Sequence, residues 1–168
     1  MSAETAPVAV VGAGPVGLVA ALSLARQGVP VVVLDAAGPE VRREWRGSTL
    51  HPPTLDALGD LGLADAVVAG GVRVERVQYR DVELDAVATF DYAALGPHAR
   101  FPFRLQFEQY KLLGMLRDAA ERAPEVQVRY RTGVTGVEQG DDAVLLHTTA
   151  DAVRARWVIG ADGAHSDL

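Results

Sequence analysis

The sequence predicts an α/β fold with a Rossmann-like parallel sheet, a βαβ unit near its start and a small antiparallel β-meander. Two short runs of continuous apolar residues, 8–11 and 31–34, are typical of parallel strands that are buried on both faces. The segment 15–28 between them is rich in Ala and Leu and ends at Gly28, a common residue just beyond a helix. Later segments alternate polar and apolar residues, which indicates antiparallel strands.

The remaining elements follow from the spacing of apolar residues and from the positions of Gly and Pro. Two further helices are predicted, one over 51–63 with a proline in its first turn and an amphipathic one over 107–123. The predicted strands are a hairpin over 72–80 and 83–92, then 126–130, 133–140, 142–150 and 153–162. Of these, 133–140 and 142–150 form the meander. We expect Trp157 to pack beside the last strand, and the polar segment 38–48 to be a surface loop.

Composition narrows the classes of partner. The formal charge is −6 with no basic block, which argues against nucleic acid and against an anionic membrane surface. There is no cysteine, so disulfides, iron–sulfur clusters and thiolate zinc sites are excluded. The four histidines have no metal-ligand spacing. Gly, Pro and polar residues interrupt the apolar stretch 8–34, so neither a signal peptide nor a membrane span is predicted. We expect a cytoplasmic protein with small-molecule partners and a single domain of 168 residues.

The glycine pattern GAGPVG predicts where a dinucleotide binds. Gly12, Gly14, Pro15 and Gly17 directly follow the first strand and open the first helix, so unpaired N–H groups and the positive end of the helix dipole face a pyrophosphate. Asp35 ends the second strand, where a carboxylate accepts a hydrogen bond from a ribose hydroxyl. An acid here disfavours a 2′-phosphate. The motif therefore predicts FAD or NAD and does not choose between them.

Four segments in the same order resemble one family. They are 8–35, 46–63 (RGSTLHPPTLDALGDLGL), 103–118 (FRLQFEQYKLLGMLRD) and 155–168 (ARWVIGADGAHSDL). Together they resemble the FAD-dependent aromatic hydroxylases, single-component flavoprotein monooxygenases similar to p-hydroxybenzoate hydroxylase. The resemblance implies that the glycines and Asp35 hold the adenosine diphosphate half of FAD. It further implies that Arg46 lies along FAD, that Gln106 contacts its flavin side, and that Asp162, with Gly163 in a close turn, serves FAD and the nicotinamide.

The resemblance implies an FAD-dependent monooxygenase that uses NADH or NADPH and O₂ to hydroxylate a small aromatic compound. Residues 1–168 would be the N-terminal part of its FAD-binding domain. The substrate domain and a C-terminal Gly-Asp motif are then absent, so we expect the chain alone to be inactive, with an incomplete flavoprotein hydroxylase fold. Exposed apolar surface and an incomplete sheet edge should favour self-association.

Other interpretations remain open. The chain is alternatively a non-enzymatic module that binds FAD or NAD, or a fragment that works only with a complementary chain. Arg46, Gln106 and the Asp162-Gly163 pair also have structural interpretations, as a solvated charge, a polar residue entering a helix and the end of a strand. The consecutive residues His165, Ser166 and Asp167 include the residue types of a hydrolase triad, but neighbours in sequence cannot easily converge into a relay.

Overall fold

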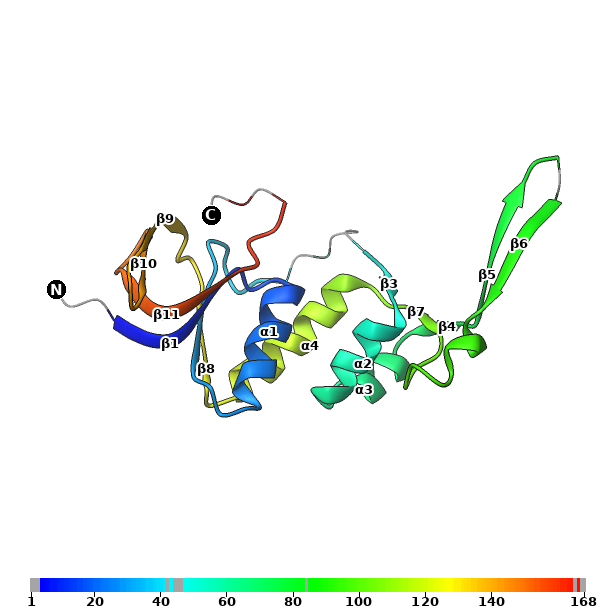
Figure 1. Cartoon of the computed structure of the whole chain (residues 1–168), viewed down its shortest axis with the longest axis horizontal. Helices are drawn as coiled ribbons and strands as arrows, with labels where there is room; N and C mark the ends of the chain where they lie inside the picture. Colours follow the sequence, from blue (N-terminus) through cyan, green and yellow to red (C-terminus); the bar gives the residue numbers. More distant parts are fainter. Residues whose placement is uncertain (1–3, 42, 44–46, 84, 165, 167–168) are drawn as a thin grey trace. The chain divides into compact units, whose positions relative to one another are not determined.

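A computed structural model describes residues 4–41, 43, 47–83, 85–164 and 166 of the chain (Figure 1). The chain divides into two compact units. The first, here called the sheet unit, comprises Met1–Arg42 and Leu113–Leu168. The second, the hairpin unit, comprises Arg43–Leu112. The division falls within helix α4 (Gln109–Arg122).

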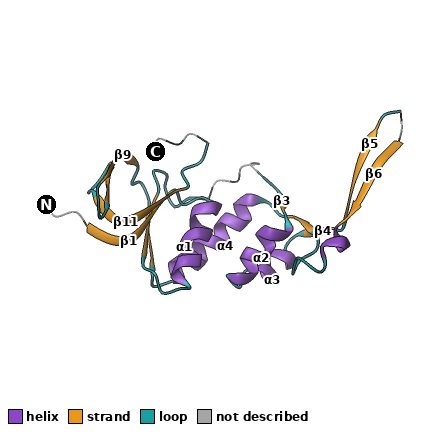
Figure 2. Ribbon diagram, viewed as in Figure 1, coloured by secondary structure: helices purple, strands orange, loops and turns teal. Residues whose placement is uncertain are grey.

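The sheet unit is built on a six-stranded mixed sheet (Figure 2). Its strands, in spatial order, are β8 (Val126–Arg129), β2 (Val31–Leu34), β1 (Glu4–Val11), β11 (Val153–Gly160), β10 (Val144–Thr148) and β9 (Val134–Gln139). The first four are parallel to one another, and β11, β10 and β9 form an antiparallel meander. The predicted parallel sheet, the pairing of 8–11 with 31–34, and the meander are therefore confirmed.

The two faces of the sheet have different roles. Alternate side chains of β1 and β2 point to opposite faces, and one face forms a core cluster with the meander: Ala9, Val11, Val32, Leu34, Val144, Leu146, Val153 and Ala155. Helix α1 (Pro15–Ala25) contacts β1, β2 and β8. It ends as predicted, because Gly28 adopts φ +73° and the N–H of Val29 donates to the carbonyl of Leu24. The βαβ unit is thus buried on both faces, as its continuous apolar runs require.

The described part of the hairpin unit contains three short helices and two small sheets. Its elements are β3 (Thr49–Leu50), α2 (Pro52–Asp60), α3 (Ala64–Ala69), β4 (Val72–Val74), β5 (Arg76–Asp81), β6 (Asp85–Asp91), a 3₁₀ helix (Tyr92–Leu95) and β7 (Arg104–Gln106). Strand β7 lies between β3 and β4, and β5 pairs with β6 in the predicted hairpin.

Two sequence-based boundaries in the hairpin unit are wrong. The single helix predicted over 51–63 is two helices, because Gly62 adopts φ +73° and the N–H of Leu63 donates to the carbonyl of Leu58, which closes α2. The strand predicted over 72–80 is divided at Glu75: β4 pairs with β7, whereas β5 pairs with β6. Strands β3 and β7 were not predicted, since two or three residues carry no detectable periodicity.

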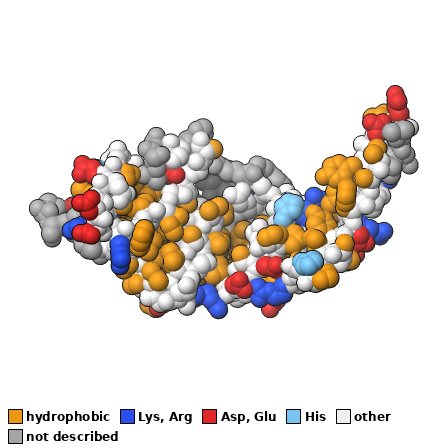
Figure 3. Space-filling model, in the orientation of Figure 1, with side chains coloured by type: hydrophobic (Ala, Val, Ile, Leu, Met, Phe, Trp, Pro, Cys, Tyr) orange, Lys and Arg blue, Asp and Glu red, His pale blue; other side chains and the backbone are white. Residues whose placement is uncertain are grey.

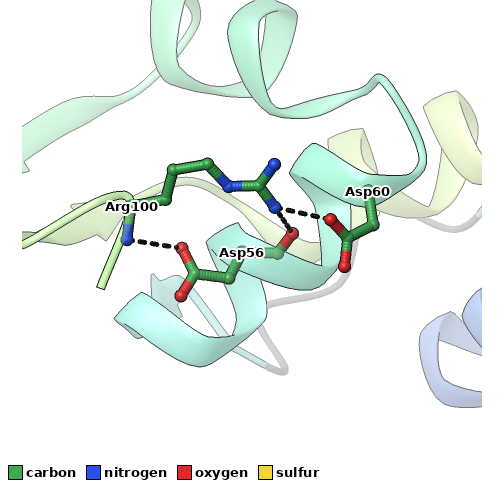
Figure 4. A network of polar contacts seen from close by, with 3 residues as sticks. All are labelled: Asp56, Asp60 and Arg100. Carbon is green, nitrogen blue, oxygen red and sulfur yellow. Dashed lines mark hydrogen bonds and ion pairs between the residues drawn. The ribbon is translucent and has the colours of Figure 1, made fainter. Parts of the chain in front are cut away.

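One polar network fixes the loop that precedes β7 (Figure 4). The backbone N–H of Arg100 donates to Oδ1 of Asp56 (3.1 Å). The Nη2 of the Arg100 side chain donates to the backbone carbonyl of Asp56 (2.7 Å) and to Oδ1 of Asp60 (2.6 Å). Both ends of one arginine thus hold this loop against α2.

The outer edge of β11 is only partly covered. Strand β10 pairs with β11 no farther along than Ala155, although β1 pairs with it as far as Gly160. Trp157 lies beyond the paired part and is 63% exposed, so the expectation that it packs is wrong. A hollow of about 360 Å³ beside it is lined by residues of the meander, including Val137, Asp142 and Arg156. Within the described ranges, no helix is both long and apolar enough to cross a bilayer.

Candidate functional site

Three strand ends meet at the carboxyl edge of the parallel sheet, in the sheet unit. The N–H of Gly12, after β1, donates to the carbonyl of Leu34 at the end of β2 (2.7 Å). The N–H of Ala161, after β11, donates to the carbonyl of Val11 (2.8 Å). This edge is where ligands bind in open parallel α/β sheets. The structure therefore brings together three predicted groups: the glycine loop, Asp35 and the Asp162 turn.

The glycines of the loop do different things. A Cβ on Gly12 would lie 2.3 Å from the carbonyl oxygen of Ala161, and Gly12 has φ +105°. A Cβ on Gly17 would lie 1.9 Å from the carbonyl oxygen of Gly12. These two glycines therefore allow close packing of the chain on itself. At Gly14 no described atom lies within 4 Å of such a Cβ. Gly14 is the position of the three that faces open space, as close approach of a ligand requires.

Helix α1 begins at this open position. Gly14 is its N-cap, Pro15 occupies the first turn, and no side chain caps the helix within the described part of the chain. The first N–H groups of a helix have no acceptor inside the helix and carry its positive dipole end. An uncapped N-terminus beside an open glycine is chemically suited to a pyrophosphate.

Asp35 is held by backbone groups. Its Oδ2 accepts from the N–H of Ala13 in the glycine loop (2.6 Å), and its Oδ1 accepts from the N–H of Ala37 (2.7 Å). The carboxylate therefore links the glycine loop to the segment after β2. Each carboxylate oxygen has a second lone pair for a ribose hydroxyl. The sequence pattern located this acid but did not reveal its backbone partners.

The Asp162 turn lies directly against the glycine loop. The Cα of Asp162 lies 3.0 Å from where a Cβ of Gly12 would be. Gly163 adopts φ +90°, a conformation that favours glycine, and no described atom lies within 4 Å of a Cβ placed there. Asp162 is half-buried. The turn thus lies beside the glycine loop, where a pyrophosphate would approach.

The remaining two predicted residues are Gln106 and Arg46. Gln106 is the last residue of β7 in the hairpin unit, and its Oε1 accepts from the hydroxyls of Thr49 (3.1 Å) and Ser48 (3.4 Å). These bonds orient its amide group. Arg46 lies outside the described residues, so its predicted role along FAD stays a prediction.

A hydrogen bond to Lys111 lowers the pKa of Glu108 and the same bond raises the pKa of Lys111; their atoms lie 2.8 Å apart at the surface. Burial raises the pKa of Tyr130, at the end of β8, while the nearby charge of Arg117 acts in the opposite direction. In the described ranges, no cluster of three or more His, Asp or Glu side chains is placed to hold a metal ion.

Comparisons with known proteins agree with this geometry. A profile of the family described as FAD binding domain matches residues 5–168. The para-nitrophenol 4-monooxygenase of Pseudomonas sp. (strain WBC-3) is 33% identical over 165 residues, covering 96% of this chain and 41% of that protein. Among solved structures, p-nitrophenol 4-monooxygenase PnpA from Pseudomonas putida DLL-E4 has a TM-score of 0.87 at 34% identity, covering 98% of this chain and 42% of that chain.

A second solved structure is similar over the same region. The flavin-dependent monooxygenase PieE, in complex with FAD and substrate, has a TM-score of 0.81 at 28% identity and covers 96% of this chain and 31% of that chain. This chain therefore spans less than half the length of each of the relatives named here.

Proposed function

The chain belongs to the FAD binding domain family, and from that premise we propose that it is the FAD-binding part of a flavin-dependent monooxygenase that hydroxylates small aromatic compounds. The observation that carries the proposal is the convergence of the glycine loop, Asp35 and the Asp162 turn at one sheet edge. Two similar proteins, named as nitrophenol monooxygenases, carry the same arrangement of segments over nearly all of this chain.

The residues of this edge fit the adenosine diphosphate half of FAD. Gly14 leaves room for the pyrophosphate at the N-terminus of α1. Asp35, already oriented by two backbone N–H groups, offers its remaining lone pairs to a ribose hydroxyl. Asp162 and Gly163 form the neighbouring wall of the site.

The protein's share of the chemistry is binding, orientation and exclusion of water. When bound, FAD supplies the redox chemistry that carries reducing equivalents from a nicotinamide to O₂. Gln106, held by two hydroxyls, is the residue we propose for the flavin end, together with Arg46. In this proposal Asp162 also takes part in binding the nicotinamide cofactor, NADH or NADPH. A cytoplasmic location remains a prediction.

The proposal is tested by ligand binding to the purified chain. We expect yellow colour in the visible spectrum or saturable quenching of FAD fluorescence, with NAD competing weakly. A folded chain that binds NAD and not FAD would contradict the proposal and favour the non-enzymatic module. We also expect no nitrophenol-dependent oxidation of NADH or NADPH by this chain alone, since the relatives are more than twice its length. Stoichiometric hydroxylated product from this chain would show that expectation to be wrong.

A further inference from the structure

Arg117 is a buried cation that the site described above does not use. It lies on α4, within the sheet unit, and its side chain is only 8% exposed. No carboxylate of the described residues lies within ion-pair distance of it, and its Nε has no hydrogen-bond partner among them. Burying an arginine costs free energy unless its charge and N–H groups find partners. The partners it does have therefore indicate its role.

Among the residues that the structure describes, Arg117 has two partners, both at the carboxyl end of the sheet. Its Nη1 donates to the carbonyl oxygen of Pro39, in the loop that follows β2. Its guanidinium also lies over the ring of Tyr130, 5.2 Å from the ring centroid, at the end of β8. Proline has no N–H, so this carbonyl is its only backbone hydrogen-bonding group. Arg117 thus joins α4 to two neighbouring strand ends.

Backbone hydrogen bonds also join the loop of residues 35–40 to residues 129–132, at and after the end of β8. The N–H of Asp35 donates to the carbonyl of Arg129 (3.0 Å), and the N–H of Thr132 donates to the carbonyl of Asp35 (2.8 Å). Farther along, the N–H of Arg131 donates to the carbonyl of Ala37 (2.9 Å). Two side chains support the second half of this loop in the described residues: Arg117, which is buried and donates to Pro39, and Arg131, which pairs with Glu40 at the surface (3.1 Å).

The position of this loop determines the position of the ribose acid. The N–H of Ala37 donates to Oδ1 of Asp35, whose Oδ2 accepts from the N–H of Ala13 in the glycine loop. A displacement of residues 37–39 therefore moves one of the two donors that orient the carboxylate. Displacements well under 1 Å matter for a group that must meet a ligand hydroxyl at hydrogen-bond distance.

We propose that Arg117 is a positioning residue for the adenosine half of the dinucleotide, acting on Asp35 through Pro39 and Ala37. This inference rests on the proposed function, because it places FAD at the same sheet edge. Arg117 contacts no ligand itself. Its ligand class is any compound with an adenosine diphosphate group, so ADP and FAD depend on it and FMN does not.

The test measures binding of ADP, FAD and FMN by calorimetry to the wild-type chain and to Arg117→Met. We expect ADP and FAD to bind about tenfold more weakly to the variant, as loss of one charged hydrogen bond predicts. The matched control is Arg122→Met, in the last turn of the same helix, where the arginine is exposed. That control should bind all three ligands as the wild type does.

A double-mutant cycle separates positioning from a general loss of folding. If Arg117 acts through Asp35, the double variant Arg117→Met/Asp35→Asn binds ADP no more weakly than Asp35→Asn alone. Additive losses would overturn the inference, as would unchanged ADP binding by a folded Arg117→Met. If Arg117→Met does not fold, Arg117→Gln takes its place in the same cycle with the same two outcomes, because its shorter, uncharged side chain does not reach the carbonyl of Pro39. A folded wild type that binds neither ADP nor FAD would instead contradict the proposed function.

Discussion

At the level of single residues, Asp35 has a role that does not depend on any ligand. Its carboxylate accepts two short hydrogen bonds from Ala13 and Ala37, at 2.6 and 2.7 Å. We expect Asp35→Asn to lower the free energy of unfolding by about 1–3 kcal/mol without FAD, because an amide loses one acceptor and the negative charge. Urea unfolding of the ligand-free chain measures this. Asp141→Asn, an exposed acid in the turn between β9 and β10, is the matched control. Unchanged stability of Asp35→Asn would indicate that the acid serves only the ribose.

Gly14 and Gly17 should separate binding from folding. A Cβ at Gly14 meets no described atom within 4 Å, whereas a Cβ at Gly17 would lie 1.9 Å from a carbonyl oxygen. We expect Gly14→Ala to keep the wild-type melting temperature and to bind FAD at least tenfold more weakly, since the methyl group occupies the space for the pyrophosphate. Gly17→Ala should lose about 1–3 kcal/mol of stability or more, because the backbone must shift. Calorimetric melting and FAD titration of both variants check this; equal melting temperatures would contradict it.

Tyr130 makes stability depend on pH in the alkaline range. Burial raises its pKa above the ordinary value near 10, so the folded chain keeps the phenolic proton at pH values where the unfolded chain releases it. Its contribution to stability is therefore fully present below about pH 10 and is lost as pH rises through the folded pKa. We expect Tyr130→Phe to show a smaller loss of stability between about pH 9 and 11 than the wild type. Urea unfolding at several pH values measures this, and parallel curves for the two proteins would contradict it.

At the level of secondary-structure elements, the meander is part of the core. Leu146 of β10 is fully buried in the cluster with β1 and β2. We expect Leu146→Ala to cost about 2–5 kcal/mol, from lost burial and the cavity that remains. Val137, its directly paired neighbour on the edge strand β9, is 44% exposed, so Val137→Ala should cost clearly less. Chemical unfolding compares the two, and equal losses would mean that the meander is not anchored through Leu146.

The elements also show what sequence patterns predict well. The βαβ unit was predictable because strands buried on both faces need continuous apolar runs, and because the glycines that pack closely have no substitute. The strands β3 and β7 were not predictable, since β7 is ordered by pairing with β3 and β4, both of which are distant from it in sequence. The break after α2 depends on the conformation of Gly62, and a glycine inside an apolar pattern does not reveal its φ.

The sequence predicted some residues of the candidate site and missed others. The resemblance located Asp162 and Gly163 by sequence alone, and the structure places that turn against Gly12. The sequence offered no signal for Arg117, because an arginine in an amphipathic helix is ordinarily solvated. Only its burial and its bond to Pro39 identify it.

At the level of the whole molecule, each unit exposes large apolar side chains. Trp157 is exposed in the sheet unit, and Tyr79 and Phe90 are exposed on the hairpin β5–β6, whose hydrophobic side chains are visible in Figure 3. Two-stranded hairpins are marginally stable in water without further contacts. We infer that these surfaces favour association between copies of the chain.

The prediction of self-association is checked by light scattering over a range of protein concentrations. We expect the apparent mass of the wild type to rise with concentration, and the double variant Trp157→Lys/Tyr79→Lys to remain closer to the monomer mass. The double variant Thr89→Lys/Thr135→Lys is the control, because it adds the same charge at exposed positions of each unit that are already polar. A wild type that stays a monodisperse monomer at every concentration would show this expectation to be wrong.

The most direct test of the cofactor site is a map of backbone amide shifts by NMR as FAD is added to the ¹⁵N-labelled chain. The site described here predicts that the largest shifts fall on three segments: 12–17 in the glycine loop, 35–37 after β2, and 161–163 after β11. Saturable shifts confined to these segments would place FAD at the carboxyl edge of the sheet. Shifts that appear elsewhere and spare all three segments, or no shifts at all in a folded chain, would contradict the account.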